Sequence, residues 1–77
     1  MTLDRITFDP GVLGGRACIR GMRIGVSLIV NLVANGLTVE RIVAEYPSLE
    51  AEDIRQALQY AAMLSREEVL PAGGARS

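Results

Sequence analysis

Residues 38–64 read TVERIVAEYPSLEAEDIRQALQYAAML and include the most strongly patterned element of the chain. In its second half, apolar side chains recur at i, i+3, i+4 and i+7, the spacing of one helical face: Ile54, Ala57, Leu58, Ala61 and Leu64. The opposite face carries Glu52, Gln56, Gln59 and Met63, flanked by Arg55 and Arg66. We expect an amphipathic helix that opens at Ser48 or Glu50, runs to about Glu68 and leaves this polar face in solvent.

The first half of the stretch predicts a shorter helix. Thr38 offers its hydroxyl as an N-cap, and Pro47 ends the helix. The buried stripe expected for it consists of Val39, Ile42, Val43 and Tyr46. Two helices joined through residues 46–50 have the arrangement of a helix-turn-helix, whose second helix enters the major groove in DNA-binding proteins. Many three-helix units only pack together, so the pattern leaves DNA binding open.

A third helix is predicted upstream of this pair. It begins at Val26 and stops at Asn35-Gly36, where glycine suits a left-handed C-terminal cap. One face holds Val26, Ile29, Leu32 and Val33, and a polar stripe holds Ser27, Asn31 and Asn35. Leu28 and Val30 flank the apolar side. We expect this helix to be covered on most sides.

Residues 1–25 have a different character, with five glycines that suit turns and short extended pieces. Short strands are predicted at Ile6-Thr7-Phe8, at Cys18-Ile19 and at Met22-Arg23-Ile24. The chain is thus expected to divide into a strand-and-turn segment (residues 1–25), a trihelical unit (26–68) and a flexible tail (69–77). The predicted fold class is mainly α, three helices preceded by short N-terminal β-strands.

Composition excludes much chemistry. The 77 residues include no His and no Lys, so an imidazole base, a His-ligated metal and a P-loop are all excluded. The single Cys18 cannot form a zinc site and is expected to be a small buried side chain. We expect no enzyme activity, no cofactor and no metal. With no membrane-spanning stretch evident, a cytoplasmic protein is expected. Apolar residues make up 49% of a chain with little interior, which favours an oligomer.

The charge is unevenly distributed, although the net value is only −1. Residues 1–25 carry a net charge of +2, and residues 26–77 carry −3. Because phosphate binding requires cations, any DNA contact is expected to involve Arg16, Arg20 and Arg23, with Arg55, Gln56 and Gln59 from the last helix. The alternative is that the three N-terminal arginines are solvated or pair with carboxylates of the helical half. Tyr60 and Met63 are candidate partner contacts.

Several motifs occur in a recognisable order, and the chain resembles the domain-of-unknown-function family 433 over about residues 3–65. They are Ile6-Thr7-Phe8-Asp9-Pro10, Gly14-Gly15-Arg16-Ala17-Cys18-Ile19-Arg20-Gly21-Met22-Arg23-Ile24, Asn35-Gly36-Leu37-Thr38, Tyr46-Pro47-Ser48-Leu49, Glu52-Asp53-Ile54 and Ala57-Leu58 with Tyr60-Ala61. The chain departs from relatives at Met22, where Thr is usual, and at Glu50, where Thr or Ser commonly caps the helix. The resemblance implies a homeodomain-like, winged-helix-like fold.

For function, the resemblance implies an antitoxin of a bacterial type II toxin–antitoxin pair. Such a protein would act as a homodimer that binds a PIN-like nuclease toxin and its own promoter DNA, and no membrane. Carboxylates hold Mg²⁺ in such nucleases, so we hypothesise that Arg66 or Arg76 enters the toxin's site and pairs with them. The alternative is a protein-interaction or dimerisation module without DNA binding, which the acidic start of the last helix favours.

Overall fold

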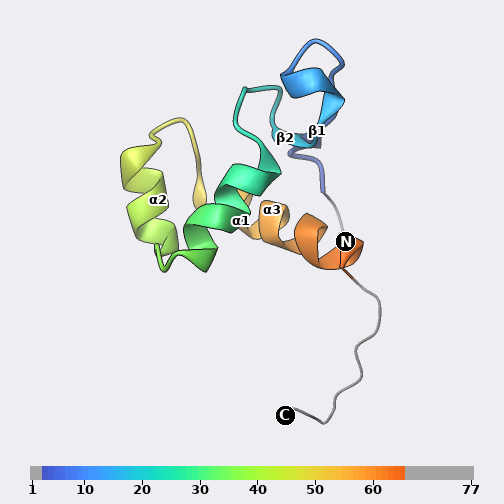
Figure 1. Ribbon diagram of the computed structural model, residues 1–77. Coiled ribbons are helices and arrows are strands. Elements are labelled where there is room, and N and C mark those ends of the chain that lie inside the picture. The colour runs from blue at the N-terminus through green and yellow to red at the C-terminus, as the bar shows by residue number, and fades with distance from the viewer. Residues whose placement is uncertain (1–2, 66–77) are drawn as a thin grey trace, which may run out of the picture.

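A computed structural model describes residues 3–65 of the protein (Figure 1). Strand β1 (Ile6–Thr7), the 3₁₀ turn η1 (Leu13–Gly15) and strand β2 (Cys18–Ile19) precede three helices, α1 (Val26–Ala34), α2 (Val39–Glu45) and α3 (Ala51–Leu64). The strands pair antiparallel, with Ile6 opposite Ile19 and Thr7 opposite Cys18. The predicted fold class, three helices behind a short two-stranded sheet, is confirmed.

The segment at residues 20–25 differs from the prediction of a third strand. Arg20 and Gly21 both have positive φ, +47° and +73°, and Met22 N–H donates to the Ile19 carbonyl at 2.8 Å. These angles reverse the chain directly after β2, so Met22 and Arg23 form a bend instead of a strand. The chain then returns to the sheet, where the Ile24 carbonyl accepts a hydrogen bond from the Ile19 N–H at 3.0 Å and Gly25 forms an isolated bridge to Cys18.

Helix α1 begins and ends where the sequence predicts. Its last turn is followed by Gly36, which has φ +94°, a conformation that favours glycine. Val26 and Ile29 are buried, but Leu28 is 37% exposed and Val30 is only half-buried. The expectation that this helix is covered on most sides is therefore wrong, because the described chain packs on only part of its surface.

The other two helices also follow their predicted signals. The Thr38 hydroxyl accepts a hydrogen bond from the Arg41 N–H at 3.1 Å and caps α2. Helix α3 has Glu50 as its N-cap, and the Glu50 N–H donates to the Asp53 carboxylate at 2.8 Å. The predicted end of this helix at about Glu68 lies outside the described residues, in which α3 ends at Leu64.

Helix α3 packs against α1, α2 and β1, so it joins the strands to the helical half. The core between these elements consists of Ile19, Val26, Ile29, Ile42, Leu49, Ile54 and Ala57. Cys18 is 1% exposed, which confirms the prediction of a small buried side chain. Within residues 3–65, no helix combines the length and apolar character needed to cross a bilayer.

Candidate functional site

A polar cluster fastens the N-terminal segment to α3, and its centre is the fully buried Asp53. Arg20 donates to both carboxylate oxygens, from Nε to Oδ1 at 3.0 Å and from Nη2 to Oδ2 at 2.8 Å. Arg5 donates from Nη1 to Oδ1 at 3.1 Å and to the Glu50 carboxylate at 2.6 Å. Arg20 also reaches the Ser48 carbonyl at 2.6 Å. One buried carboxylate thus holds two arginines from the strand segment.

These contacts set the ionisation of the cluster. Burial alone would raise the pKa of Asp53, but hydrogen bonds from Arg20, from the Glu50 N–H and from Arg5 outweigh it and hold the pKa below its ordinary value. The pKa values of Arg5 and Arg20 are raised, mainly by their hydrogen bonds to the carboxylates. All three groups are therefore charged across the neutral range. Arg20, whose backbone is left-handed, thus has its guanidinium bound to Asp53.

A second link between α3 and the N-terminal segment runs through Gln56, which is 3% exposed. Its Oε1 accepts a hydrogen bond from the Arg5 backbone N–H at 2.9 Å, and its Nε2 donates to Asp4 at 2.9 Å and to Glu52 at 2.8 Å. The prediction that Gln56 lies on the solvent face of the helix is therefore wrong. The strand segment covers this part of α3, which helical periodicity alone does not reveal.

The residues predicted to contact DNA consequently separate into different environments. Arg20 and Gln56 serve the fold. Arg55 is exposed, but it pairs with Glu52 and also donates to the Gln59 side chain at 2.8 Å. That pairing, with the hydrogen bond from Gln56, lowers the pKa of Glu52 to about 2. The exposed start of α3 therefore has paired charges rather than free cations.

Arg16 and Arg23 differ from Arg20 and Arg55 in having no carboxylate partner among the described residues. Both are exposed, and neither makes an ion pair within residues 3–65. The alternative prediction, that the three N-terminal arginines are solvated or pair with carboxylates of the helical half, has a different outcome for each residue. Arg20 pairs, whereas Arg16 and Arg23 keep their charge available to solvent.

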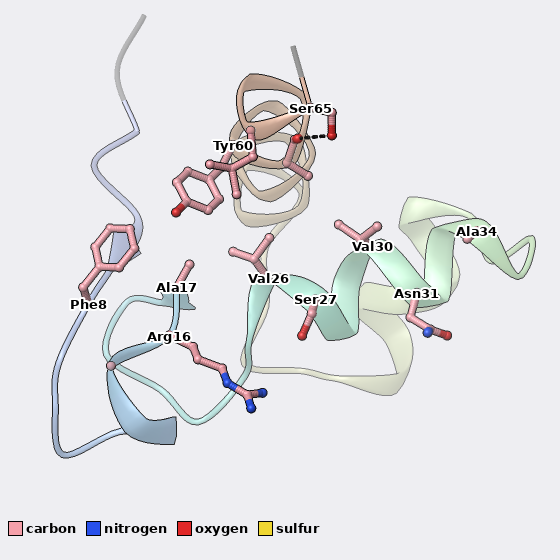
Figure 2. Close-up of a pocket in the computed structure, with 13 residues that line it drawn as sticks. Phe8, Arg16, Ala17, Val26, Ser27, Val30, Asn31, Ala34, Tyr60 and Ser65 are labelled. Atoms are coloured by element: carbon pink, nitrogen blue, oxygen red, sulfur yellow. Dashed lines mark hydrogen bonds between the residues drawn. The ribbon is translucent and has the colours of Figure 1, made fainter. Parts of the chain in front are cut away.

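An apolar groove lies between α1, α3 and the N-terminal segment (Figure 2). Its volume is about 690 Å³, and its lining includes Phe8, Ala17, Val26, Val30, Ala34, Tyr60, Ala61 and Leu64. The Phe8 and Tyr60 rings meet edge to face, with centroids 5.8 Å apart and planes at 62°. Small side chains at residues 17, 34 and 61 leave the space open. We call this feature the α1–α3 groove.

The rim of the α1–α3 groove is polar on one side. Ser27, Asn31 and Arg16 line it there, on the wall opposite Tyr60 (Figure 2). Ser65 lies at the end of α3, where it donates to the Ala61 carbonyl at 3.0 Å. Arg16 is the only charged residue among those lining the groove, in the part of the chain that the structure describes. An occupant would meet apolar walls and one cation.

Two of the four residues predicted to contact a protein partner lie in the described part of the chain. Tyr60 lines the groove, and Met63 is 50% exposed on the neighbouring surface of α3. Arg66 and Arg76 lie outside the described residues. Phe8 and Leu64, predicted in a short strand and on the apolar face of the last helix, are 57% and 70% exposed, and neither was predicted to contact a partner. The sequence signal for exposed apolar side chains was the apolar content of 49%, which is more than the small core of a 77-residue chain can bury.

The acidic side chains and the thiol of the described region do not gather into a metal-binding cluster. Across residues 3–65, no three side chains of Cys, Asp or Glu gather closely enough to hold a metal ion. Every buried polar side-chain atom there has a hydrogen-bond partner. The cluster around Asp53 is thus saturated by its own contacts, and the α1–α3 groove is the feature with unused binding surface.

Comparison with known proteins gives three matches. The family model "Protein of unknown function (DUF433)" matches residues 6–61. An uncharacterized protein of Sinorhizobium fredii, y4eO, is 45% identical over 56 residues, which are 73% of this chain and 25% of that protein. The crystal structure of a DUF433 member from Anabaena variabilis is 38% identical, with a TM-score of 0.71 over 82% of this chain and 61% of that one. The chain thus spans only a quarter of the length of the Sinorhizobium relative.

Proposed function

This chain belongs to the DUF433 family, and we propose that it is an antitoxin-type binding protein that holds a protein partner in the α1–α3 groove. The antitoxin role and a PIN-like nuclease as the partner are what the family resemblance implies. The observation that carries the proposal is the groove itself, an apolar surface that the described chain leaves uncovered.

Exposed apolar surface of this kind supports protein binding. Phe8, Met63 and Leu64 are each at least half exposed and lie in or beside the groove, although solvent exposure of such side chains is unfavourable. Aromatic anchors next to small residues are typical of the centres of protein interfaces. Tyr60, with its ring in the groove, supplies such an anchor.

The test uses the product of the reading frame beside this gene, because toxin and antitoxin genes are adjacent. Ala61→Arg fills the groove with a charged side chain, whereas Ala62→Arg places the same side chain one residue further along α3, on exposed surface outside the lining. We expect Ala61→Arg to abolish co-purification and protection from toxicity, and Ala62→Arg to retain both. Equal behaviour of the two variants would contradict the groove as the binding surface.

The hypothesis that Arg66 or Arg76 enters the toxin's site has its own test. The double variant Arg66→Ala, Arg76→Ala is expected to bind the toxin and fail to silence it. Full silencing by this variant would remove that part of the proposal while leaving binding in the groove intact.

Promoter binding by a homodimer is a second candidate function, and one observation favours it. Arg16 and Arg23 are exposed cations without a carboxylate partner in the described residues. The start of α3 favours the alternative, a module without DNA affinity, because Arg55 is already paired with Glu52. If DNA is bound, we therefore expect the N-terminal loops to supply most of the phosphate contacts.

Measuring the affinity for the upstream DNA over a series of salt concentrations, with a scrambled duplex as control, distinguishes promoter binding from a module without DNA affinity. For binding through phosphate contacts, log K falls with log salt by about 0.9 per contact. Arg16→Ala and Arg23→Ala are each expected to reduce this slope by about one contact per protomer. Absence of binding at low salt would leave the protein-interaction module, and sedimentation of the same sample reports whether it is a dimer.

A further inference from the structure

The α1–α3 groove begins where the described chain ends. Leu64 and Ser65, the last two described residues, are both part of its lining. Twelve more residues follow, with the sequence REEVLPAGGARS. Every molecule therefore carries its own peptide tethered at the edge of the groove, at an effective concentration in the millimolar range for a short linker.

The chemistry of this segment matches that of the groove. Its first part holds an acidic pair, Glu67-Glu68, followed directly by an apolar pair, Val69-Leu70. The groove offers apolar walls and, on the side opposite α3, the cation Arg16, which makes no ion pair with any of the residues that the structure describes. No carboxylate is among the described residues that line it, so an acidic segment meets no like charge there.

The segment after Ser65 is long enough for its apolar pair to enter the groove. Val69 lies four residues beyond Ser65, which corresponds to at most about 14 Å of extended chain. The groove separates two packed helices, whose axes typically lie about 8–10 Å apart. The apolar pair can therefore enter the groove while the acidic pair approaches the opposite wall.

We propose that residues 66–77 of the same chain occupy the α1–α3 groove, with Val69 and Leu70 on its apolar walls and Glu67 or Glu68 paired with Arg16. This inference deepens the proposed function, because a protein partner then has to displace the segment. A segment docked in nine of ten molecules weakens the partner's apparent affinity about tenfold.

The direct test needs no partner and uses the full chain. In a uniformly ¹³C,¹⁵N-labelled sample, we expect methyl NOEs from Leu70 to Val30 or Ala61. The variant Val69→Ser, Leu70→Ser is expected to remove them and to shift the amide resonances of Tyr60 and Ala61. The matched variant Ala72→Ser, Ala75→Ser, later in the same segment, is expected to leave the groove resonances unchanged.

A charge exchange tests the ion pair. Arg16→Glu should weaken the NOEs, and adding Glu67→Arg and Glu68→Arg should restore them, whereas Arg23→Glu serves as the control outside the groove. Absence of NOEs in the unaltered chain overturns the proposal. NOEs that appear only between differently labelled molecules overturn it in favour of a second copy as the occupant.

The two proposals fail in distinguishable ways. If the groove holds the segment but no protein, the NOEs are present and Ala62→Arg fails to co-purify a partner just as Ala61→Arg does. If the groove binds a partner without the segment, the NOEs are absent and Val69→Ser, Leu70→Ser leaves the partner's affinity unchanged instead of strengthening it about tenfold.

Discussion

Replacement of Asp53 by asparagine tests whether the polar cluster holds the fold together. The side chain keeps its size, and one oxygen remains to accept a hydrogen bond, but the charge that two arginines share is lost. The unaltered carboxylate accepts four hydrogen bonds, three of them from guanidinium groups. In the variant, the new amide N–H₂ faces guanidinium donors.

The magnitude follows from burial. Breaking a buried ion pair from one side costs about 3–5 kcal/mol when the remaining charge has no access to water. Here the side chains of Arg5 and Arg20 are 26% and 38% exposed, so water recovers part of their hydration. We expect a loss of about 2–3 kcal/mol, against a total stability of about 4–12 kcal/mol for a chain of this length.

Urea unfolding followed by far-UV circular dichroism measures this loss, and the thermal midpoint should fall by about 10–20 °C. Glu45→Gln is the matched control, because it breaks the exposed α2 ion pair with Arg41 and should change stability by less than about 0.5 kcal/mol. Equal stabilities of Asp53→Asn and Glu45→Gln would refute the reasoning, since they would show that the cluster contributes no more than a surface pair.

Three further outcomes follow from the same structure. Gln56→Leu should cost about 1–3 kcal/mol, because a backbone N–H of the N-terminal segment loses its acceptor, while Gln59→Leu should stay within about 0.5 kcal/mol. Urea midpoints that rank these two variants the other way would contradict the assigned contacts. Thr38→Ala should cost about 1 kcal/mol through loss of the α2 cap, and an unchanged midpoint would show that the cap is not needed. Glu52 and Asp53 both have lowered pKa values in the folded state, so each stabilises the fold at neutral pH and this contribution is lost in acid. For Glu52, whose folded-state pKa is about 2, the loss runs from about pH 4.5 towards about pH 2. Asp53→Asn should flatten the fall of stability in acid titration, and an unchanged slope would contradict the assigned ion pairs.

Local signals predicted most of the helical half. The Thr38 cap, the Asn35-Gly36 stop and the break at Pro47 each act through backbone groups a few residues away, so the sequence carries their full information. The two paired strands were predicted for the same reason. The turn directly after β2 was not, because a positive φ at a residue other than glycine, such as Arg20, has no local signal in the sequence.

The candidate site was less accessible to sequence reasoning. Helical periodicity separates the core stripe from the rest of α3 but does not show whether a second layer covers the remainder, which is why Gln56 was misplaced. The contacts of Asp53 link residues separated by 33 and 48 positions. The groove depends on where small side chains from three separate segments of the chain meet, and the sequence does not show this. Tyr60 and Met63 were predicted as partner contacts because aromatic and apolar side chains beside a polar stripe are visible in the sequence itself.

The attachment of the strand segment to Asp53 also has a consequence for the order in which the newly synthesised chain folds. Arg20 leaves the ribosome 33 residues ahead of the carboxylate that holds it. At synthesis rates of 5–20 residues per second, this corresponds to a delay of about 2–7 s, and the delay for Arg5 is longer. During that interval the strands have neither their ionic partner nor the helix that covers them. The strand segment is thus synthesised before α3, but it can form its ion pairs with Asp53 only after α3 has been synthesised.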